Sequence, residues 1–281
     1  MISSTIYTKM NVLSLFDGMS CGQIALNRAG IAYDKYYASE IDKHAIKVTQ
    51  HNYPNTKQLG DVTKITTENT PKIDLLIGGS PCQGFSFAGS ELNFNDPRSM
   101  LFFEYVRLLR ELKPKWFLLE NVVMKQEYQD VISKYLGVQP IMINSSLVSA
   151  QNRKRLYWTN IPFLLPEDLG IILSDIVGEN KGVWVFPRGF NKGGVQLYKG
   201  KCPCLTTSSW QYNFKLVLPD ESKRKFTPEE CEQFQTVPVG YTSCVSESHR
   251  YKILGNGWTV EVIAHILKGI NNETLRNQRT S

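Results

Sequence analysis

The sequence predicts an α/β fold in which a doubly wound, mostly parallel sheet carries a second, small and irregular lobe. From residue 10 to about 160, short β-rich runs alternate with helical stretches, and strands that alternate with helices form parallel sheets covered on both faces. Beyond residue 160 the alternation stops, and residues 178–215 are rich in Gly, Lys and aromatic side chains without a regular period. We therefore expect a main domain over residues 1–160, a small lobe over 161–240 and a C-terminal segment over 241–281 that returns to the main domain.

The elements of the main domain follow from apolar runs of strand length and from apolar residues at helical spacing. The helix over residues 99–112 carries its apolar stripe at 101, 102, 105, 108, 109 and 112, and Pro114 ends it. Farther along, Thr227 and Pro228 are typical of a helix start, and residues 259–270 have the pattern of a last helix. In full, strands are expected over 11–16, 36–41, 73–78, 116–119 and 140–146, and helices over 22–29, 42–51, 99–112 and 126–135.

The net charge of +6 is concentrated in the small lobe. No acidic residue occurs between Glu179 and Asp220, and this stretch holds six basic residues, a number equal to the whole net charge, with seven aromatic residues among them. Such a mixture suits a polyanion such as nucleic acid, but it is also typical of a basic surface over a small local core, and composition leaves both interpretations open. The residues are Lys181, Arg188, Lys192, Lys199, Lys201 and Lys215, with Trp184, Phe186, Phe190, Tyr198, Trp210, Tyr212 and Phe214.

Composition also argues against several classes of protein. The longest apolar runs are far too short to span a membrane, and the first ten residues lack the basic and apolar regions of a signal peptide, so we expect a cytoplasmic protein, or a nuclear one in a eukaryote. The six cysteines form no Cys-x-x-Cys pair and only four histidines are present, so no metal site is expected and the thiols should be reduced. The sequence leaves a monomer and a homodimer open.

The first motif with chemical meaning is LFDGMSCG at residues 15–22. Gly18 and Gly22 bracket a tight turn between a strand and a helix, a geometry that brings backbone N–H groups and a helix N-terminus to a ligand. Glu40 ends the second predicted strand, where an acid can bind ribose hydroxyls, and Asp61 ends a further short strand, where it could take an adenine amino group. Each feature alone also fits a tight connection, a solvated loop or a helix cap.

The second motif, GGSPCQGFS at residues 78–86, places Cys82 in a glycine-lined loop after the third predicted strand. A free cysteine is usually a small buried hydrophobe, but this polar loop is poor core material. To act as a nucleophile the thiol has to lose its proton, starting from a reference pKa of about 8.5. Gly84 and Gly89 are candidate hinges of a mobile lid over a substrate.

Two further motifs place charged side chains at the same edge of the sheet. Glu120, in LLENV, ends an apolar strand, and a carboxyl group in partly apolar surroundings can act as a proton donor. Arg153 and Arg155, in QNRKRLYW, share one face of an extended segment by the period of two, and two planar donors suit a carbonyl oxygen and a phosphate. A strand-end cap and a basic, solvated strand edge are the alternative interpretations.

Together these motifs resemble those of the DNA cytosine-5 methyltransferases. FDGMSCG, GGSPCQGFS, LLENV, QNRKR and the late YKILGNGWTV occur in the order of that family, and residues 226–242 resemble the segment before its last motif. The resemblance covers residues 10–160 and 200–270. In motif detail, including SMLFFEYVRLLRELKP and the tryptophan after GNG, the chain is most similar to the catalytic domain of the de novo methyltransferases and to small phage and bacterial orphan methyltransferases.

The resemblance implies the methyltransferase fold, S-adenosylmethionine (SAM) as the cofactor, S-adenosylhomocysteine as its product and double-stranded DNA as the partner. It implies that Cys82 attacks carbon 6 of a flipped-out cytosine, and that Glu120 binds ring nitrogen 3 and the exocyclic amine. Arg155 would hold the base carbonyl, with Arg153 supporting Glu120 or a phosphate. These four residues are the implied catalytic set, and the sequence does not name the base that removes the carbon-5 proton.

The resemblance also assigns residues to the cofactor and to DNA. Phe16 would stack on adenine, residues 17–21 would line the methionine end, Glu40 would bind the ribose, and Asp61 with Val62 would bind the adenine. In full, the implied cofactor residues are Phe16, Asp17, Gly18, Met19, Ser20, Cys21, Glu40, Ile41, Asp61, Val62, Pro81, Asn256, Gly257 and Trp258. The candidate DNA contacts, in and beside the small target-recognition lobe, are Gln83, Ser86, Arg188, Lys192, Lys199, Thr206 and Thr207.

The sequence departs from the family at some positions and leaves other activities open. Ser20 and Cys21 replace the Gly-Gly of many bacterial members, and Ala88 stands where several relatives place the residue that fills the gap left by the flipped base. A tRNA cytosine-5 methyltransferase is one alternative, although that branch carries a Cys-Phe-Thr tripeptide absent from this sequence. A catalytically inactive scaffold and an enzyme that uses a modified SAM derivative are the others. Intact Cys82, Glu120 and Arg155 argue against the scaffold.

Overall fold

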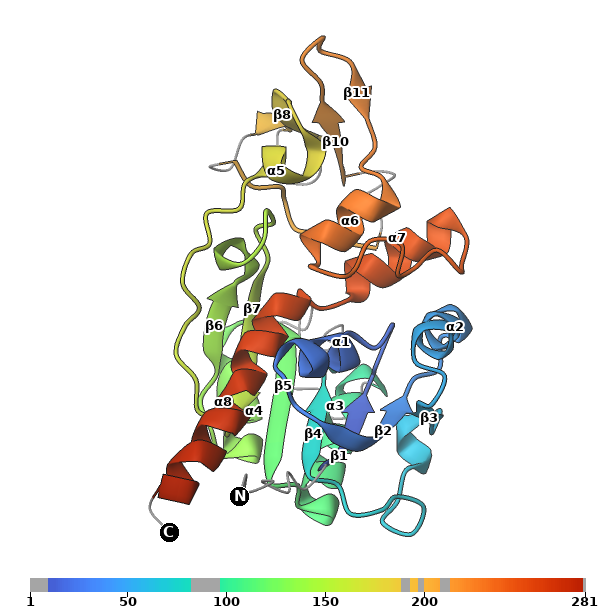
Figure 1. Ribbon diagram of the computed structural model, residues 1–281, viewed down its shortest axis with the longest axis vertical. Helices are drawn as coiled ribbons and strands as arrows, with labels where there is room; N and C mark the ends of the chain where they lie inside the picture. Colours follow the sequence, from blue (N-terminus) through green and yellow to red (C-terminus); the bar gives the residue numbers. More distant parts are fainter. Residues whose placement is uncertain (1–9, 82–96, 188–192, 197–199, 208–212, 280–281) are drawn as a thin grey trace, which may run out of the picture.

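The computed structural model of the chain describes residues 10–81, 97–187, 193–196, 200–207 and 213–279. Its main element is a seven-stranded sheet with the order β3-β2-β1-β4-β5-β7-β6. Strands β1 to β5 run parallel and β7 is antiparallel to both of its neighbours, so the predicted α/β fold with a mostly parallel sheet is confirmed (Figure 1). The strands are β1 (Met10–Leu15), β2 (Tyr33–Ser39), β3 (Lys57–Gln58), β4 (Leu75–Gly78), β5 (Trp116–Val122), β6 (Ile141–Asn144) and β7 (Lys154–Thr159).

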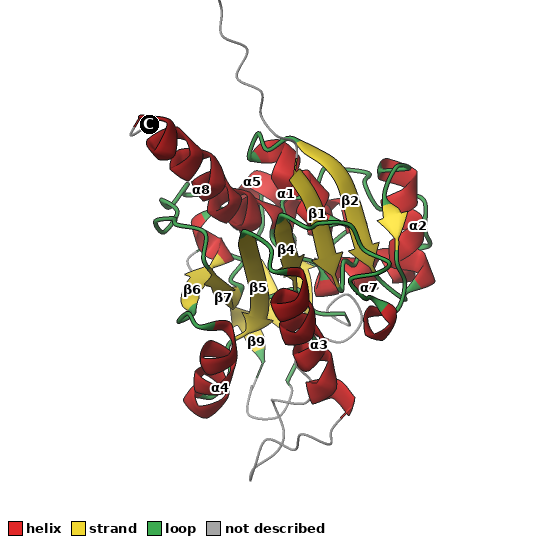
Figure 2. Ribbon diagram, turned by 90° about the horizontal axis from the view of Figure 1, so that it is seen from below, coloured by secondary structure: helices red, strands yellow, loops and turns green. Residues whose placement is uncertain are grey.

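Helices cover both faces of this sheet. Figure 2 shows α3 and α4 on one face and α1 and α8 on the other, and each face has its own apolar core, with Phe102 and Ile132 on the first and Ile24 and Ile263 on the second. Within the described ranges, no helix has the length and apolar character needed to cross a lipid bilayer. The helices packed on the sheet are α1 (Cys21–Arg28), α2 (Lys43–Asn52), α3 (Pro97–Leu112), α4 (Gln126–Leu136) and α8 (Val260–Arg279), with short 3-10 turns η1 (Val62–Lys64) and η2 (Ser145–Leu147).

Nearly all of the predicted elements begin and end within three residues of the observed ones. Strand β5 continues past Leu119 to Val122 because its last residues pair with β7, so Glu120 lies inside the strand rather than at its end. Helix α8 is longer than predicted and runs to Arg279. Helix α7 (Glu247–Asn256) has no counterpart among the predicted elements, because its buried residues gather in its C-terminal half and form no amphipathic stripe.

The predicted small lobe is more regular than its sequence suggests. Its described residues include a four-stranded antiparallel sheet with the order β11-β10-β8-β9. The strands are only two to four residues long, which is too short for a period of two to stand out in the sequence. The elements are α5 (Leu173–Val177), β8 (Gly182–Val185), β9 (Gly194–Gln196), β10 (Phe214–Val217) and β11 (Lys223–Arg224).

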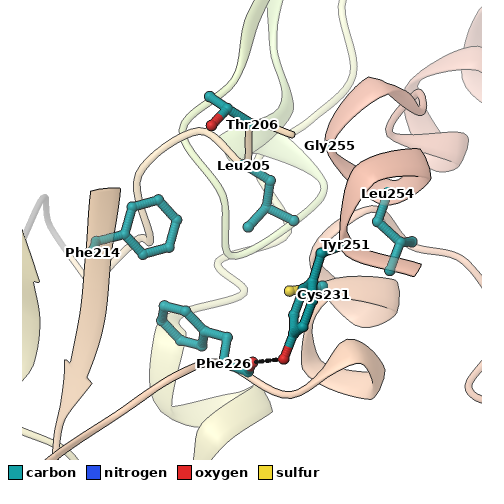
Figure 3. A pocket seen from close by; sticks show the side chains of 8 residues that line it. All are labelled: Leu205, Thr206, Phe214, Phe226, Cys231, Tyr251, Leu254 and Gly255. Atoms are coloured by element: carbon teal, nitrogen blue, oxygen red, sulfur yellow. Dashed lines mark hydrogen bonds between the residues drawn. The ribbon is translucent and has the colours of Figure 1, made fainter. Parts of the chain in front are cut away.

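A chain of aromatic rings connects the small sheet to α6 (Pro228–Phe234). Phe214 of β10 packs edge-on against Phe226, and Phe226 packs against Phe234, with ring centroids 5.6 and 5.2 Å apart. Tyr251 of α7 completes the group, donating from Oη to the Phe226 carbonyl at 2.6 Å (Figure 3). The cavity between these side chains measures only about 10 Å³, so it is a packing gap rather than a ligand site.

Two of the basic side chains of the small lobe bind partners within the protein. Lys201 is 8% exposed, and its Nζ donates to three backbone carbonyls, two in the segment around η2 and one before α5. Lys181 forms an ion pair with Glu221 at 2.9 Å. Lys201 is therefore a structural link between the small lobe and the large sheet, and the count of six basic residues overstates the charge that a polyanion can reach.

Candidate active site

The order of the strands creates an opening at the carboxyl ends of β1 and β4. These two strands are neighbours, but the chain leaves β1 toward β2 and leaves β4 toward β5, so the two connections diverge. Open α/β sheets bind ligands in the crevice at such a point. A cavity of about 500 Å³ lies here, and its walls come from the ends of β1, β2, β4 and β5, from β7 and from the segment after α7.

The first wall is a strained turn after β1. Phe16, Gly18 and Ser20 have positive φ angles of 57°, 58° and 65°. Glycine adopts this conformation readily, but a phenylalanine in it is uncommon and must be held by its surroundings. Glu40, which follows β2, accepts from the Gly18 N–H at 2.7 Å and from the next two backbone N–H groups after itself at 2.8 Å. The Glu40 carboxylate therefore fastens the strained turn to the start of α2.

Asp17 lies in the same turn and is only 8% exposed. Its Oδ1 accepts from Tyr36 Oη at 2.7 Å, whereas its Oδ2 is buried without a hydrogen-bond partner among the described residues. Burial raises the pKa of Asp17 to about 6. The hydroxyls of Ser14 and Ser20 also act on this carboxyl group and lower its pKa against the effect of burial. A carboxyl group in the wall of a cavity suits a cationic ligand.

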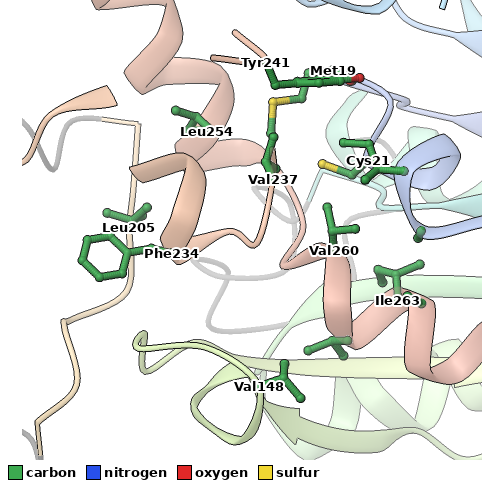
Figure 4. Close-up of a cluster of buried hydrophobic side chains, with 14 of the residues drawn as sticks. Met19, Cys21, Val148, Leu205, Phe234, Val237, Tyr241, Leu254, Val260 and Ile263 are labelled. Atoms are coloured by element: carbon green, nitrogen blue, oxygen red, sulfur yellow. The ribbon is translucent and has the colours of Figure 1, made fainter. Parts of the chain in front are cut away.

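The opposite wall is the segment that follows α7. Gly257 has no room for a side chain, because a Cβ atom there would lie 2.8 Å from Cε of Met19. Tyr241 donates from Oη to the carbonyl of Met19 at 2.7 Å, across 222 residues of sequence. Figure 4 shows Met19 and Tyr241 together at the edge of a buried cluster that also holds Cys21 and Val237. The C-terminal part of the chain therefore packs directly on the turn after β1.

The third group of side chains centres on Glu120 of β5, which is 8% exposed. Its Oε1 forms an ion pair with Nε of Arg155 at 2.9 Å, and its Oε2 accepts from Nε1 of Trp258 at 3.1 Å. The next residue, Asn121, donates from Nδ2 to the carbonyl and hydroxyl oxygens of Ser80 at 3.3 Å. Both oxygens of Glu120 are thus held by donors of the protein, and β5 is tied to the turn after β4.

Arg153 lines the cavity and contacts the small lobe and the end of α7. It is 4% exposed, and its guanidinium donates to the carbonyl of Leu205 at 2.9 Å and to those of Gly255 and Gly257 at 3.2 and 2.9 Å. No hydrogen bond or ion pair joins it to Glu120 in the part of the chain that the structure describes. These carbonyls give the buried guanidinium its partners, and the expected support of Glu120 or a phosphate stays a prediction. Arg153 fastens the small lobe and the end of α7 to the large sheet.

A comparison with protein families matches residues 10–162 and 185–272 to the C-5 cytosine-specific DNA methylases. The chain belongs to this family. The matched ranges include the turn after β1, the Glu120–Arg155 pair and the segment that carries Trp258. The family motifs therefore coincide with the walls of the cavity.

Curated relatives of this methylase come from phages and bacteria. The chain is 33% identical over 229 residues to the orphan methyltransferase M.Rho11sI of Bacillus phage rho11s, covering 76% of the chain and 42% of the relative. It is 30% identical over 298 residues to the type II methyltransferase M1.ScrFI of Lactococcus lactis subsp. cremoris, covering 91% of the chain and 76% of the relative. The chain thus spans less than half the length of the phage relative.

Solved structures share the fold of the methylase. The Entamoeba histolytica methyltransferase EhMeth superposes with a TM-score of 0.75 at 17% identity, covering 95% of this chain and 99% of that one. The S. pombe Dnmt2 methyltransferase superposes with a TM-score of 0.72 at 20% identity over the same shares of the two chains. At such low identity the likeness establishes the architecture alone.

The cavity of the methylase gathers the residues that the sequence singles out. Every implied cofactor residue except Ser20 lines it, together with Glu120, Arg153 and Arg155, while Ser20 is fully buried. Thr206 and Thr207 are exposed on the small lobe. The remaining named residues lie outside the described ranges, and they are Cys82, Gln83, Gly84, Ser86, Ala88, Gly89, Arg188, Lys192 and Lys199.

Sequence reasoning missed several residues of the site. Gly79 and Asn121 stand beside Pro81 and Glu120 in their motifs, so a closer look at the flanks of each motif would have found them. Tyr36 has no local signal, because its contact with Asp17 exists only once β2 has paired with β1.

Replacing Arg153 by methionine keeps a long side chain but removes every donor. The carbonyls of Leu205 and Gly255 then lose the donor that Arg153 provides in a buried joint, while that of Gly257 keeps Gln235. We expect the free energy of unfolding to fall by roughly 2–4 kcal/mol. The measurement is chemical denaturation of both proteins. The matched control is Arg28→Met, which breaks a part-exposed ion pair with Glu261 and should cost about 1 kcal/mol or less. Equal losses in the two variants would contradict the structural role of Arg153.

Proposed function

We propose that the chain transfers a methyl group from SAM to carbon 5 of a flipped-out cytosine in double-stranded DNA, through a covalent adduct with Cys82. One observation carries the proposal. A single cavity joins the turn after β1, which suits a cationic cofactor, to the Glu120–Arg155 pair, which suits the polar edge of a pyrimidine. Membership of a family described by its C-5 cytosine specificity supports the reaction class.

The residues around the turn after β1 fit SAM. Its ammonium group would meet the carboxyl group of Asp17, which lines the cavity. Glu40 follows β2, where carboxylates of α/β folds bind ribose hydroxyls, and Phe16 offers a flat ring to the adenine, with Asp61 and Val62 on the same wall. When bound, SAM supplies an electrophilic methyl group. The protein has to orient this group toward the base and exclude water.

Cys82 is the proposed nucleophile. It follows Pro81, which lines the cavity, so the chain enters the Cys82 loop at the cavity edge. The thiolate would add to carbon 6 of cytosine, which makes carbon 5 electron-rich enough to take the methyl group. A base then removes the carbon-5 proton, and the returning electrons expel the Cys82 thiolate. Other cysteines are poorer candidates, since burial raises the thiol pKa of Cys21 to about 12 and that of Cys202 well above its usual value.

Glu120 and Arg155 would stabilise the ring during this addition. Attack at carbon 6 shifts electron density toward ring nitrogen 3 and the carbonyl oxygen. Glu120 can bind nitrogen 3 and the exocyclic amine, and the planar guanidinium of Arg155 can donate to the carbonyl. The ion pair of 2.9 Å between them fixes both groups before the base arrives. The target atom is out of reach inside a duplex, so the cytosine has to rotate out of the helix.

Duplex DNA is the substrate that the comparisons favour. The family description names DNA, and the Cys-Phe-Thr tripeptide of the tRNA branch is absent from the sequence. Thr206 and Thr207 lie close to the cavity, because a Cβ atom on Gly255 would collide with their backbone. Together with Arg188, Lys192 and Lys199 they would place the small lobe against the duplex beside the flipped base.

The direct test measures transfer of labelled methyl from SAM into duplex DNA and, separately, into tRNA. We expect 5-methylcytosine in DNA, loss of the signal in Cys82→Ala, and a fall of roughly 100-fold or more in Glu120→Gln, because the neutral amide loses the ion pair with Arg155 and cannot exchange a proton with ring nitrogen 3. The matched control Cys244→Ala, at a partly exposed thiol, should keep full activity. Label in tRNA alone would favour the RNA alternative. No label with SAM still bound would favour an inactive scaffold or a modified donor.

The raised pKa of Asp17 predicts how SAM binding depends on pH. Only the ionised carboxylate attracts the ammonium group, so SAM affinity should weaken as the pH falls below about 6, by up to tenfold per unit. Asp17→Asn should bind SAM about 10- to 100-fold more weakly at pH 7.5 and lose this dependence. Because the folded-state pKa is raised, ionised Asp17 destabilises the unliganded chain above pH 6, so the variant should also unfold at a higher temperature.

Titration calorimetry between pH 5 and 7.5 and thermal unfolding without SAM measure the two effects. The control Asp34→Asn, at an exposed position of β2, should change neither. Wild-type affinity that stays constant down to pH 5 would contradict the role given to Asp17.

A further inference from the structure

One side chain, that of Trp258, contacts both the cofactor wall of the cavity and the Glu120–Arg155 pair. Trp258 stands in the segment after α7 and lines the cavity with the turn after β1. Its indole Nε1 donates to Oε2 of Glu120 at 3.1 Å, while Arg155 occupies Oε1 from the other side. Trp258 is therefore in contact with the residue that is proposed to bind the cytosine ring.

The chemistry of this contact is directional. An indole N–H can only donate, and so can a guanidinium, so the two groups hold the two oxygens of Glu120 as acceptors and fix the plane of its carboxyl group. With one donor on each oxygen, the carboxyl group cannot rotate without breaking a hydrogen bond to a charged acceptor. Each oxygen still has a second lone pair for a substrate.

Hydrogen bonds to the backbone of residues 257 and 258 hold the segment that carries the indole. The carbonyl of Gly257, the residue before it, accepts from Arg153 at 2.9 Å and from Gln235 at 3.1 Å. The carbonyl of Trp258 lies 3.8 Å from the Cys21 thiol, within the wall of the turn after β1. The side chain of Trp258 therefore extends from an anchored segment, as a positioning group requires.

The neighbouring residue leaves the space that the contact needs. A Cβ atom on Gly79 would lie 2.9 Å from Nε1 of Trp258 and 3.0 Å from Oε2 of Glu120. Gly79 does not have a positive φ angle, so its backbone conformation is open to any residue and the close approach alone requires glycine here. Any larger residue would stand at the point where the indole meets the carboxylate.

We propose that Trp258 is a positioning residue of this methylase, which holds the Glu120 carboxylate in the orientation that binds the cytosine edge. The inference rests on the proposed function, since it concerns how Glu120 meets the base. It goes beyond the expected part of Trp258 as a cofactor residue. It predicts that the indole N–H contributes to the chemical step more than to SAM binding.

The first test is Trp258→Phe, which keeps an aromatic ring and removes the N–H. We expect kcat for 5-methylcytosine formation to fall about 10- to 100-fold, the range of one hydrogen bond to a charged group, while the Kd for SAM changes by less than about threefold. The control is Trp116→Phe at the opposite end of β5, where the ring is 5% exposed in the core. This control should lower the unfolding temperature and leave kcat within about twofold.

Two further variants separate positioning from packing. Gly79→Ala keeps the side chains of both Trp258 and Glu120, but the added methyl group pushes them apart. It should lower kcat by about the same factor as Trp258→Phe. In Glu120→Gln the amide has one acceptor oxygen, which Arg155 takes, so adding Trp258→Phe should cost less than about twofold more. A Trp258→Phe enzyme with unchanged kcat and weakened SAM binding, or full additivity with Glu120→Gln, would overturn the proposal. Absence of 5-methylcytosine with the wild-type enzyme would instead refute the proposed function.

Discussion

The position of β1 beside β4 is the constraint on which the rest of the site depends. Because the connections of these strands leave in opposite directions, the turn after β1 and residues 79–81 after β4 line one cavity. The pairing of β4 with β5 then brings Glu120 beside Gly79, and the antiparallel pairing of β5 with β7 brings Arg155 opposite Val122. The separation between the cofactor wall and the base-binding pair is therefore set by the hydrogen-bond register of the sheet, which is far stiffer than a loop.

Buried polar contacts decide how the C-terminal part of the chain closes this space. Glu232 of α6 is fully buried and accepts from the N–H groups of Gly240 and Thr242, and Arg250 pairs with it at 3.1 Å. A buried charge is tolerated only with such partners, so the segment has one satisfactory arrangement. Asp17 departs from this pattern, since its Oδ2 lacks a donor in the described residues. The Glu232 charge thus has strong internal partners, whereas Asp17, in the cavity wall, has only hydroxyl groups beside it.

The sequence predicted the large sheet and most of the cavity because short segments of sequence carry the signals for both. Apolar runs mark the strands and polar residues mark their ends, so Glu40 and Glu120 could be named in advance, whereas Phe16 and Trp258 were named through the family resemblance. Contacts that exist only after folding could not be predicted from the sequence. Arg153 and Arg155 were expected on one face of an extended segment, but Arg153 lies just before β7. Its side chain donates to the carbonyls of Leu205, Gly255 and Gly257, whereas that of Arg155 pairs with Glu120. The short strands of the small lobe lacked a readable period for the same reason, since their stability comes from packing between Phe214, Phe226 and Phe234.

The central claim is that carbon 5 is activated by a covalent bond to Cys82, and the most direct measurement is the mass of the trapped adduct. A duplex in which 5-fluorocytosine replaces the target cytosine has no carbon-5 proton to remove, so the enzyme cannot expel its thiolate after methyl transfer. With SAM present, the account predicts a stable protein–DNA complex, and peptide mass spectrometry should locate a methylated fluoropyrimidine on Cys82. An adduct on another residue would contradict the account. So would the absence of an adduct from an enzyme that methylates ordinary duplex DNA.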